Sequence, residues 1–195
     1  MIKNIFIFLL IILLSSCSLL GPVKSDYTTY VVRTVPCKVR LANTHKVLYV
    51  SPVETDPLYD TDNMAYSVHP LQVEYYAKNK WAETPANMIQ PLIIKTLRDT
   101  QHFRAVTTSQ NVQHDYILNT KITELRQVYN AHSTYAEFRL LAEIVNTRTG
   151  KIIATQEFMC REPMCQRNPY GGASAANITV ANVMDQLAQF SARAT

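Results

Sequence analysis

The stretch YYAKNKWAETPANMIQPLIIKTLRDTQHFRAV, residues 75–106, predicts a strand end, one amphipathic helix and a return strand. Thr84 can cap the helix through its hydroxyl, and Pro85 suits the first helical position, where no backbone donor is needed. Apolar residues then recur at helical spacing and predict one buried face: Met88, Ile89, Leu92, Ile93 and Leu97. The return strand is expected over 103–106.

A proline inside this helix is the feature that disturbs the pattern. Pro91 removes one backbone hydrogen bond and crowds the preceding turn. We therefore expect either a kink at Pro91 or a regular helix that begins near Asn87. The whole stretch is a packing unit and contains no recognisable catalytic motif.

The amino-terminal residues 1–16 resemble a secretory signal rather than part of the fold. Lys3 is followed by an apolar run over residues 5–14. This run is too short to span a bilayer, which needs about 20 apolar residues. The sequence Leu-Ser-Ser-Cys that ends at Cys17 resembles the bacterial lipobox, which implies acylation of Cys17 with chains such as palmitate. An ordinary cleaved signal with an incidental cysteine is the alternative. Ser18 follows, and in such lipoproteins a non-aspartate there usually permits delivery to the outer membrane; the inner membrane is the alternative.

The mature chain predicts a short tether over 17–26 and one domain over 27–195, long enough for a sizeable core. The whole sequence carries a formal net charge of +4, and its basic residues are scattered. This mild positive charge does not favour nucleic acid as a partner.

The rest of the chain predicts a mixed sheet with a second helix. Strands are expected over residues 27–35, 46–53, 64–68, 71–76, 115–125, 136–144 and 151–158. NTRTG, residues 146–150, is expected to form a hairpin turn. A helical stripe is predicted over 173–194, with Val180, Val183, Leu187 and Phe190 in line. The order predicts an α+β domain in which two helices cover one sheet face, because each apolar face must find a partner.

Acidic residues, cysteines and histidines offer few chemical motifs. The acidic stretch 54–62 lacks the glycine and distal glutamate of a calcium loop, so a solvated loop is favoured. Cys160 and Cys165 are expected to form a local disulfide with Cys37 left free or buried, and pairing of Cys37 with either is the alternative. No histidine has metal-ligand spacing to this pair, so no metal or other cofactor is expected. The sequence shows no recognised nucleophile context, and we expect no enzymatic activity.

Three aromatic residues near the first helix allow two interpretations. In the first, Trp81 locks the approach to the helix from the core and Tyr75 lies under it. In the second, Trp81 and Tyr76 bind a partner, because Tyr and Trp are common interface anchors. We favour the core for Trp81, and the two interpretations are nearly balanced for Tyr76, on the opposite strand face.

Several motifs together resemble the ABC-type transport auxiliary lipoproteins. They are KVLYVSPV (46–53), Tyr59-Asp60, LQVEYYAKNKWAETP (71–85) with its Lys80, Trp81, Ala82, Glu83 and Pro85, FRAV (103–106), NTRTG (146–150) and KIIATQEF (151–158). The match covers about 27–190 in order and spacing. Pro91 and the cysteines near Cys160 depart from the family's pattern.

This resemblance implies a fold similar to the N-terminal domain of TolB and a role beside a phospholipid transporter that supports envelope integrity. The implied partners are a periplasmic mammalian-cell-entry domain protein and its ABC transporter, reached by a domain held to the membrane through its lipid anchor. A second copy of the chain is a further possible partner. The alternatives are a lipoprotein of a secretion or cell-wall assembly with the same fold, or a direct lipid carrier.

Overall fold

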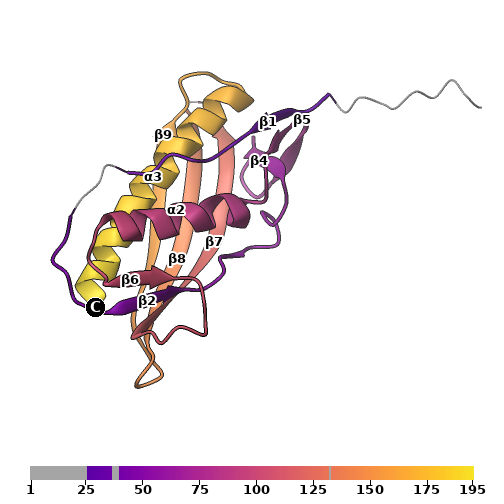
Figure 1. The fold of residues 1–195 in the computed structure, drawn as a ribbon. Helices are drawn as coiled ribbons and strands as arrows, with labels where there is room; N and C mark the ends of the chain where they lie inside the picture. The colour runs from indigo at the N-terminus through magenta and orange to yellow at the C-terminus, as the bar shows by residue number, and fades with distance from the viewer. Residues whose placement is uncertain (1–25, 37–39, 132) are drawn as a thin grey trace, which may run out of the picture.

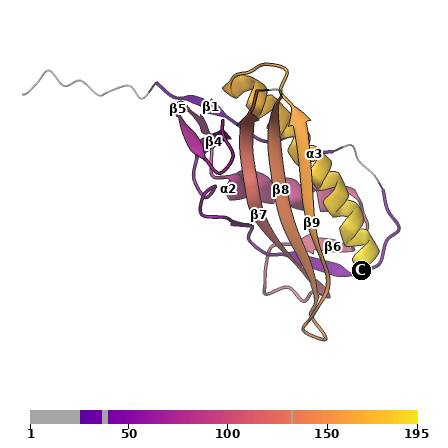
Figure 2. The same ribbon diagram turned by 180° about the vertical axis from the view of Figure 1, so that it is seen from behind.

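The structure, a computed structural model, describes residues 26–36, 40–131 and 133–195. Within these residues a nine-stranded mixed sheet carries two helices, α2 (Pro85–Asp99) and α3 (Pro169–Ala194). Figure 1 shows both helices in front of the sheet, and Figure 2 shows the long strands on the opposite face with no helix over them. The expected α+β domain with two helices on one sheet face is therefore confirmed.

A three-stranded antiparallel meander supplies the three longest strands of the sheet. Its strands are β7 (Tyr116–Tyr129), β8 (Thr134–Asn146) and β9 (Lys151–Pro163). The NTRTG turn joins β8 to β9, and Gly150 adopts a φ of 66° there, which glycine tolerates best. The alternation predicted for the middle strand is confirmed, because its core-facing residues are fully buried: Ala136, Phe138, Leu140, Ala142 and Ile144.

Shorter strands complete the sheet along the other edge of β7. They are β1 (Thr28–Tyr30), β2 (Val47–Val50), β3 (Glu54–Thr55), β4 (Asn63–Ser67), β5 (Glu74–Trp81) and β6 (Ala105–Thr107). Strands β2, β3 and β4 pair with β7 one after another, all in parallel. Strand β6 extends the sheet beside β2, and β5 and β1 extend it beside β4. Among the strands of the described residues, β9 pairs only with β8, and its other edge is free of strand partners there.

Helix α2 follows its sequence pattern closely. Its five predicted core residues are all buried, and it begins at Pro85 as expected. The Thr84 hydroxyl makes no capping bond; instead the Thr84 carbonyl accepts from the amide of Met88 at 3.1 Å. The helix runs through Pro91, which lies on the exposed side. The carbonyl of Asn87 loses its amide partner there, and water can replace it because Asn87 is exposed.

Helix α3 begins four residues earlier than the sequence predicts. It starts at Pro169, and the Asn168 side chain caps it by accepting from the amide of Gly171 at 2.8 Å. Gly171 and Gly172, expected before the helix, lie in its first turn. A Cβ on Gly172 would lie 1.9 Å from the Gln127 side chain, so the glycine allows the first turn of α3 to approach Gln127 on β7.

The strand predicted over 71–76 is displaced. Strand β5 begins at Glu74, while Leu71 is fully exposed in the preceding turn with a φ of 66°. Tyr75 points outward and Tyr76 packs against the core, the reverse of the predicted alternation. The reversal follows from the turn, because a strand that starts at a different residue can present its other face.

A β-bulge at Thr123 changes the phase of β7. The pairing with β8 shifts between Ile122 and Glu124, so two residues oppose one at this point. Ile122 and Leu125 consequently both face the core, and Gln127 and Tyr129 continue on that face. The bulge is thus the reason that a polar amide lies beneath α3.

The acidic stretch 54–62 contains strand β3 followed by a turn. The carboxylate of Asp56 accepts from the amide of Leu58 at 3.0 Å, and Tyr59 is buried beside it. Burial, with the nearby Glu124 carboxylate, raises the pKa of Tyr59 to about 12. Asp62 pairs with Lys80 at 3.1 Å. The stretch is thus organised by turn and ion-pair contacts within the chain.

Candidate docking site

Three tyrosines from neighbouring strands form a ring cluster beside the start of α3. Tyr66 lies on β4, Tyr76 on β5 and Tyr129 at the end of β7. The ring centroids of Tyr66 and Tyr76 are 4.5 Å apart, and the ring of Tyr66 meets that of Tyr129 edge-on at 6.2 Å. Such offset and edge-on arrangements are the favourable ones for aromatic pairs. The cluster therefore has a fixed geometry.

A buried glutamine organises the hydroxyl groups of this cluster. The hydroxyls of Tyr76 and Tyr129 donate to Oε1 of Gln127 at 2.9 and 3.0 Å, and the two hydroxyl oxygens lie 2.5 Å apart. Burial raises the pKa of both tyrosines, and the contact with Tyr129 raises that of Tyr76 further. Both hydroxyls are therefore protonated donors at neutral pH. The amide nitrogen of Gln127 has no partner within the described chain.

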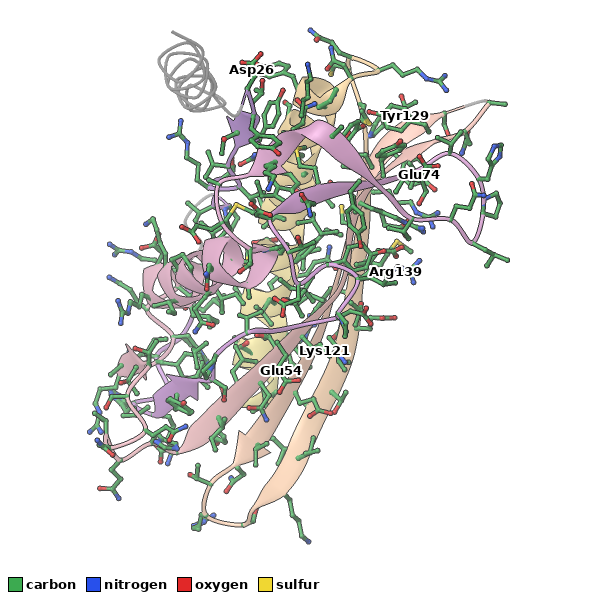
Figure 3. All side chains as sticks on the ribbon, turned by 90° about the vertical axis from the view of Figure 1, so that its right-hand side faces the viewer. Asp26, Glu54, Glu74, Lys121, Tyr129 and Arg139 are labelled. Atoms are coloured by element: carbon green, nitrogen blue, oxygen red, sulfur yellow. The ribbon has the colours of Figure 1, made fainter. Side chains whose placement is uncertain are left out.

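The cluster forms one wall of an open hollow of about 430 Å³, which we call the tyrosine hollow. Its lining consists of Tyr66, Val68, Tyr76, Tyr129, Arg167, Asn168 and Pro169. The guanidinium of Arg167 lies 5.8 Å from the ring centre of Tyr129. Aromatic rings beside one arginine suit a partner that presents an apolar side chain next to a negatively charged group. Tyr129, at the end of β7, is labelled in Figure 3.

The structural role of the Tyr76 hydroxyl can be tested by mutation. We expect Tyr76→Phe to lower the free energy of unfolding by about 1–2 kcal/mol, because the change removes the donor that Gln127 uses. Tyr75→Phe is the matched control: its hydroxyl donates to the carbonyl of Leu58 at the surface, so a change of about 0.5 kcal/mol or less is expected. Chemical denaturation measures both, and equal effects would contradict the buried network.

Trp81 lies in the core, with 4% of its surface exposed. Its backbone amide donates to the carbonyl of Asp62 at 2.7 Å, which joins the end of β5 to the residue just before β4. Tyr75, expected beneath Trp81, is instead exposed on the other strand face. Of the two partner-binding candidates, only Tyr76 therefore borders an accessible hollow.

The sheet face away from the helices carries a charged network that the sequence did not suggest. Glu137 is fully buried, and its Oε1 lies 2.9 Å from Arg139 and 3.0 Å from Arg161. Its Oε2 lies 3.4 Å from Arg126. Glu124 joins the network at 2.6 Å from both Arg126 and Arg139. The five side chains crosslink β7, β8 and β9 on the uncovered face.

The free edge of β9 is the second accessible feature of this face. Ile152, Ile153 and Met159 on this strand are all exposed. A long edge strand offers unpaired amides and carbonyls to another chain, and apolar side chains beside it add contact area. The uncovered face and the β9 edge together form a candidate docking surface, which we call the β9 surface.

The predicted Cys160–Cys165 disulfide is absent, because these two residues are not bonded to each other and neither forms a disulfide within the described residues. Cys160 lies within β9, and the extended chain carries Pro163 about 10 Å away from it. A disulfide needs Cα atoms within about 7 Å, so the strand keeps the two thiols apart. The Cys160 sulfur instead lies 3.7 Å from the amide nitrogen of Asn182 on α3. Cys17 and Cys37 lie outside the described residues.

Within residues 26–36, 40–131 and 133–195, no group of three or more His, Cys, Asp or Glu side chains is arranged to hold a metal ion. Neither helix in these ranges is long and apolar enough to cross a membrane.

The chain belongs to the family of ABC-type transport auxiliary lipoproteins. A family model described as the ABC-type transport auxiliary lipoprotein component matches residues 32–188. The protein is therefore an auxiliary lipoprotein component of an ABC-type transport system. No match was found among the curated proteins.

Solved structures with the same fold support the architecture. A protein from Xanthomonas campestris superposes with a TM-score of 0.74 at 17% identity, over 86% of this chain and 95% of its own. An uncharacterised protein superposes with a TM-score of 0.65 at 12% identity, over 84% and 97%. A hypothetical protein from Chlamydia trachomatis gives 0.50 at 7% identity, over 76% and 97%. At these identities the likeness concerns the fold alone.

Proposed function

We propose that this protein is a non-catalytic, lipid-anchored adaptor of a transport system that moves phospholipid and supports envelope integrity. The observation that carries the proposal is the family match over residues 32–188, together with the lipobox-like sequence at Cys17. Acyl chains on Cys17 hold the domain at the membrane, because each buried methylene contributes about 0.8 kcal/mol. Ser18 favours the periplasmic face of the outer membrane, and the inner membrane is the alternative.

The proposed partner is a periplasmic mammalian-cell-entry domain protein linked to the ABC transporter. The β9 surface suits this docking, because it combines a free strand edge with exposed apolar side chains and a rigid charged face. A second copy of the chain could use the same edge. The adaptor works by being held between membrane and partner, so no reaction is assigned to its side chains.

A pull-down from detergent-solubilised membranes tests the partner. We expect the tagged protein to recover the mammalian-cell-entry protein, and Met159→Lys to reduce this recovery about tenfold, because a charge is placed in the interface. Val112→Lys is the matched control, since Val112 and Met159 are similarly exposed at 44% and 47% and Val112 lies in a loop. Recovery of a secretion or cell-wall assembly instead would support the alternative class of lipoprotein.

Removal of the anchor residue tests the tether. We expect Cys17→Ser to move the protein from the membrane to the soluble fraction, because the thiol that receives the diacylglycerol is lost. Mass spectrometry of the native protein should show acyl chains on Cys17. A non-acylated native protein that still sediments with membranes would contradict the tether. Phospholipid retained by gently purified protein would favour the direct lipid carrier.

A further inference from the structure

The chain that follows β1 crosses over the first turns of α3, as Figure 1 shows for the indigo segment. We call residues 31–34 the strap. Val32 is buried in the core, while Val31 and Arg33 on either side are exposed, as expected of an extended chain. The strap therefore buries the side chain of Val32 in the core and leaves those of Val31 and Arg33 exposed to solvent.

One side chain of α3 fixes the strap. Oδ1 of Asn177 accepts from the amides of Arg33 and Thr34 at 3.0 and 3.2 Å and from the Thr34 hydroxyl at 2.9 Å. Its Nδ2 donates to the carbonyls of Val31 and Ala173, both at 2.9 Å. All the polar capacity of this amide is therefore used. The strap and the start of α3 form one preorganised surface.

An open hollow of about 550 Å³ lies between the strap and α3, and we call it the strap hollow. Tyr170, Ser174 and Ile178 line it from one face of the helix, and Val31 and Arg33 line it from the strap. The tyrosine and both aliphatic residues are exposed. Arg33 is the one charged residue among the described residues of the lining. The hollow therefore combines an exposed apolar surface with a single positive charge.

The strap hollow is separated from the proposed lipid anchor by only a short stretch of the sequence. Cys17 precedes Asp26 by nine residues, which span at most about 32 Å in any conformation. Thr29, which lines the hollow, follows Asp26 by only three residues. Figure 3 shows Asp26 at the same end of the molecule as Tyr129, where β7 ends. Because β7 extends for about 45 Å, a tether of at most about 32 Å from an acylated Cys17 would keep this end nearer to the bilayer than the opposite end.

We propose that the strap hollow rests on the glycerophospholipid bilayer that holds the anchor, with Tyr170 and Ile178 at the headgroup level. Tyrosine is common at this level, and the exposed apolar residues gain burial there. Arg33 faces the lipid phosphates, which its positive charge complements. The inference depends on the lipid anchor in the proposed function. The β9 surface belongs to other elements of the fold and can bind the protein partner.

Brominated lipids test this contact on the acylated full chain. The protein is reconstituted on vesicles of phosphatidylethanolamine and phosphatidylglycerol with brominated acyl chains, which quench nearby tryptophan. Ile178→Trp places a probe at the hollow, and Ile153→Trp on β9 is the matched control, since both isoleucines are 43% exposed. Trp81 is buried and provides the same background in both variants. We expect a loss of emission for Ile178→Trp and unchanged emission for Ile153→Trp.

A charge variant and a flotation control complete the experiment. Adding Arg33→Gln to Ile178→Trp should lower the ratio of docked to undocked protein about fivefold, because one basic residue near an anionic surface is lost. Flotation with the vesicles separates the two proposals, since protein that fails to float refutes the anchor. Protein that floats without quenching at position 178, or with equal quenching at 153, overturns the inference. A blue shift at 178 without quenching would place a second copy of the chain in the hollow and also overturn the inference.

Discussion

Glu137→Ala is expected to lower the free energy of unfolding by about 3–5 kcal/mol. Glu137 is fully buried on the uncovered sheet face and contacts Arg126, Arg139 and Arg161. Removing its carboxylate leaves three arginines with Glu124 as the remaining acidic partner in the network. Thermal or chemical unfolding measures the loss. Glu143→Ala, a change on the same face of β8, is the control, and a change of about 0.5 kcal/mol is expected there because Glu143 is less buried.

The same residue predicts a pH dependence. Burial alone would raise the pKa of Glu137, but hydrogen bonds from Arg139 and Arg161 outweigh it and hold the pKa below its ordinary value of 4.5. A lowered carboxyl pKa stabilises the fold above the unfolded-state pKa, and this stabilisation is lost as the pH falls through the folded value. The difference in stability between wild type and Glu137→Ala should therefore shrink below about pH 4.5.

Glu124 contributes with the opposite sign. Burial, together with the nearby Glu137 carboxylate, raises the pKa of Glu124. A raised carboxyl pKa stabilises the fold at low pH, and that contribution is lost as the pH rises through the folded value. The wild-type profile therefore mixes both effects, and because Glu137 contributes to the raised pKa of Glu124, the comparison with Glu137→Ala measures the two coupled carboxylates together. A difference that stays constant from pH 7 to pH 3 would contradict the ion-pair account.

Gly171→Ala is the second change with a large expected effect. Within a helix, replacing glycine by alanine usually stabilises by about 1 kcal/mol. Here the added Cβ would lie 2.1 Å from the carbonyl oxygen of Gln166, which is part of the backbone and cannot move aside easily. We therefore expect a loss of about 1–3 kcal/mol instead.

The matched control for Gly171→Ala lies on the same helix. Gln186 is exposed on α3, and Gln186→Ala should change the stability by only a few tenths of a kcal/mol, about the difference in helix propensity. Melting temperatures of both variants provide the comparison. If Gly171→Ala raised the melting temperature, the close approach of α3 to residue 166 would be wrong.

Sequence periodicity predicted the regular parts of the fold. The apolar spacing of α2 and the alternation of β8 identified their buried residues, because one face of each packs on a single core. The predicted start of β5 was wrong. The turn around Leu71 delays the strand and decides which face Tyr75 and Tyr76 occupy. The early start of α3 was missed because Gly171 and Gly172 suggested a loop, whereas close packing requires them within the helix.

The candidate site was only partly predictable. The sequence singled out Tyr76, but its partners Gln127 and Tyr129 are more than 50 positions away along the chain. Their inward direction depends on the bulge at Thr123, and local alternation gives no signal for a bulge. The network around Glu137 was missed for a similar reason, because pairing across three strands brings its charges together.

The pairing of β2, β3 and β4 with one edge of β7 has a consequence for biosynthesis. Residues 47–67 leave the ribosome well before their strand partner, residues 116–129, has been made. The meander and α3, by contrast, are contiguous in the chain and are made after residues 47–67, so local contacts can assemble them soon after they emerge. The part of the sheet that is made later can therefore assemble before the part that is made first. The nascent first half travels with its apolar strands unpaired, the state that holdase chaperones recognise.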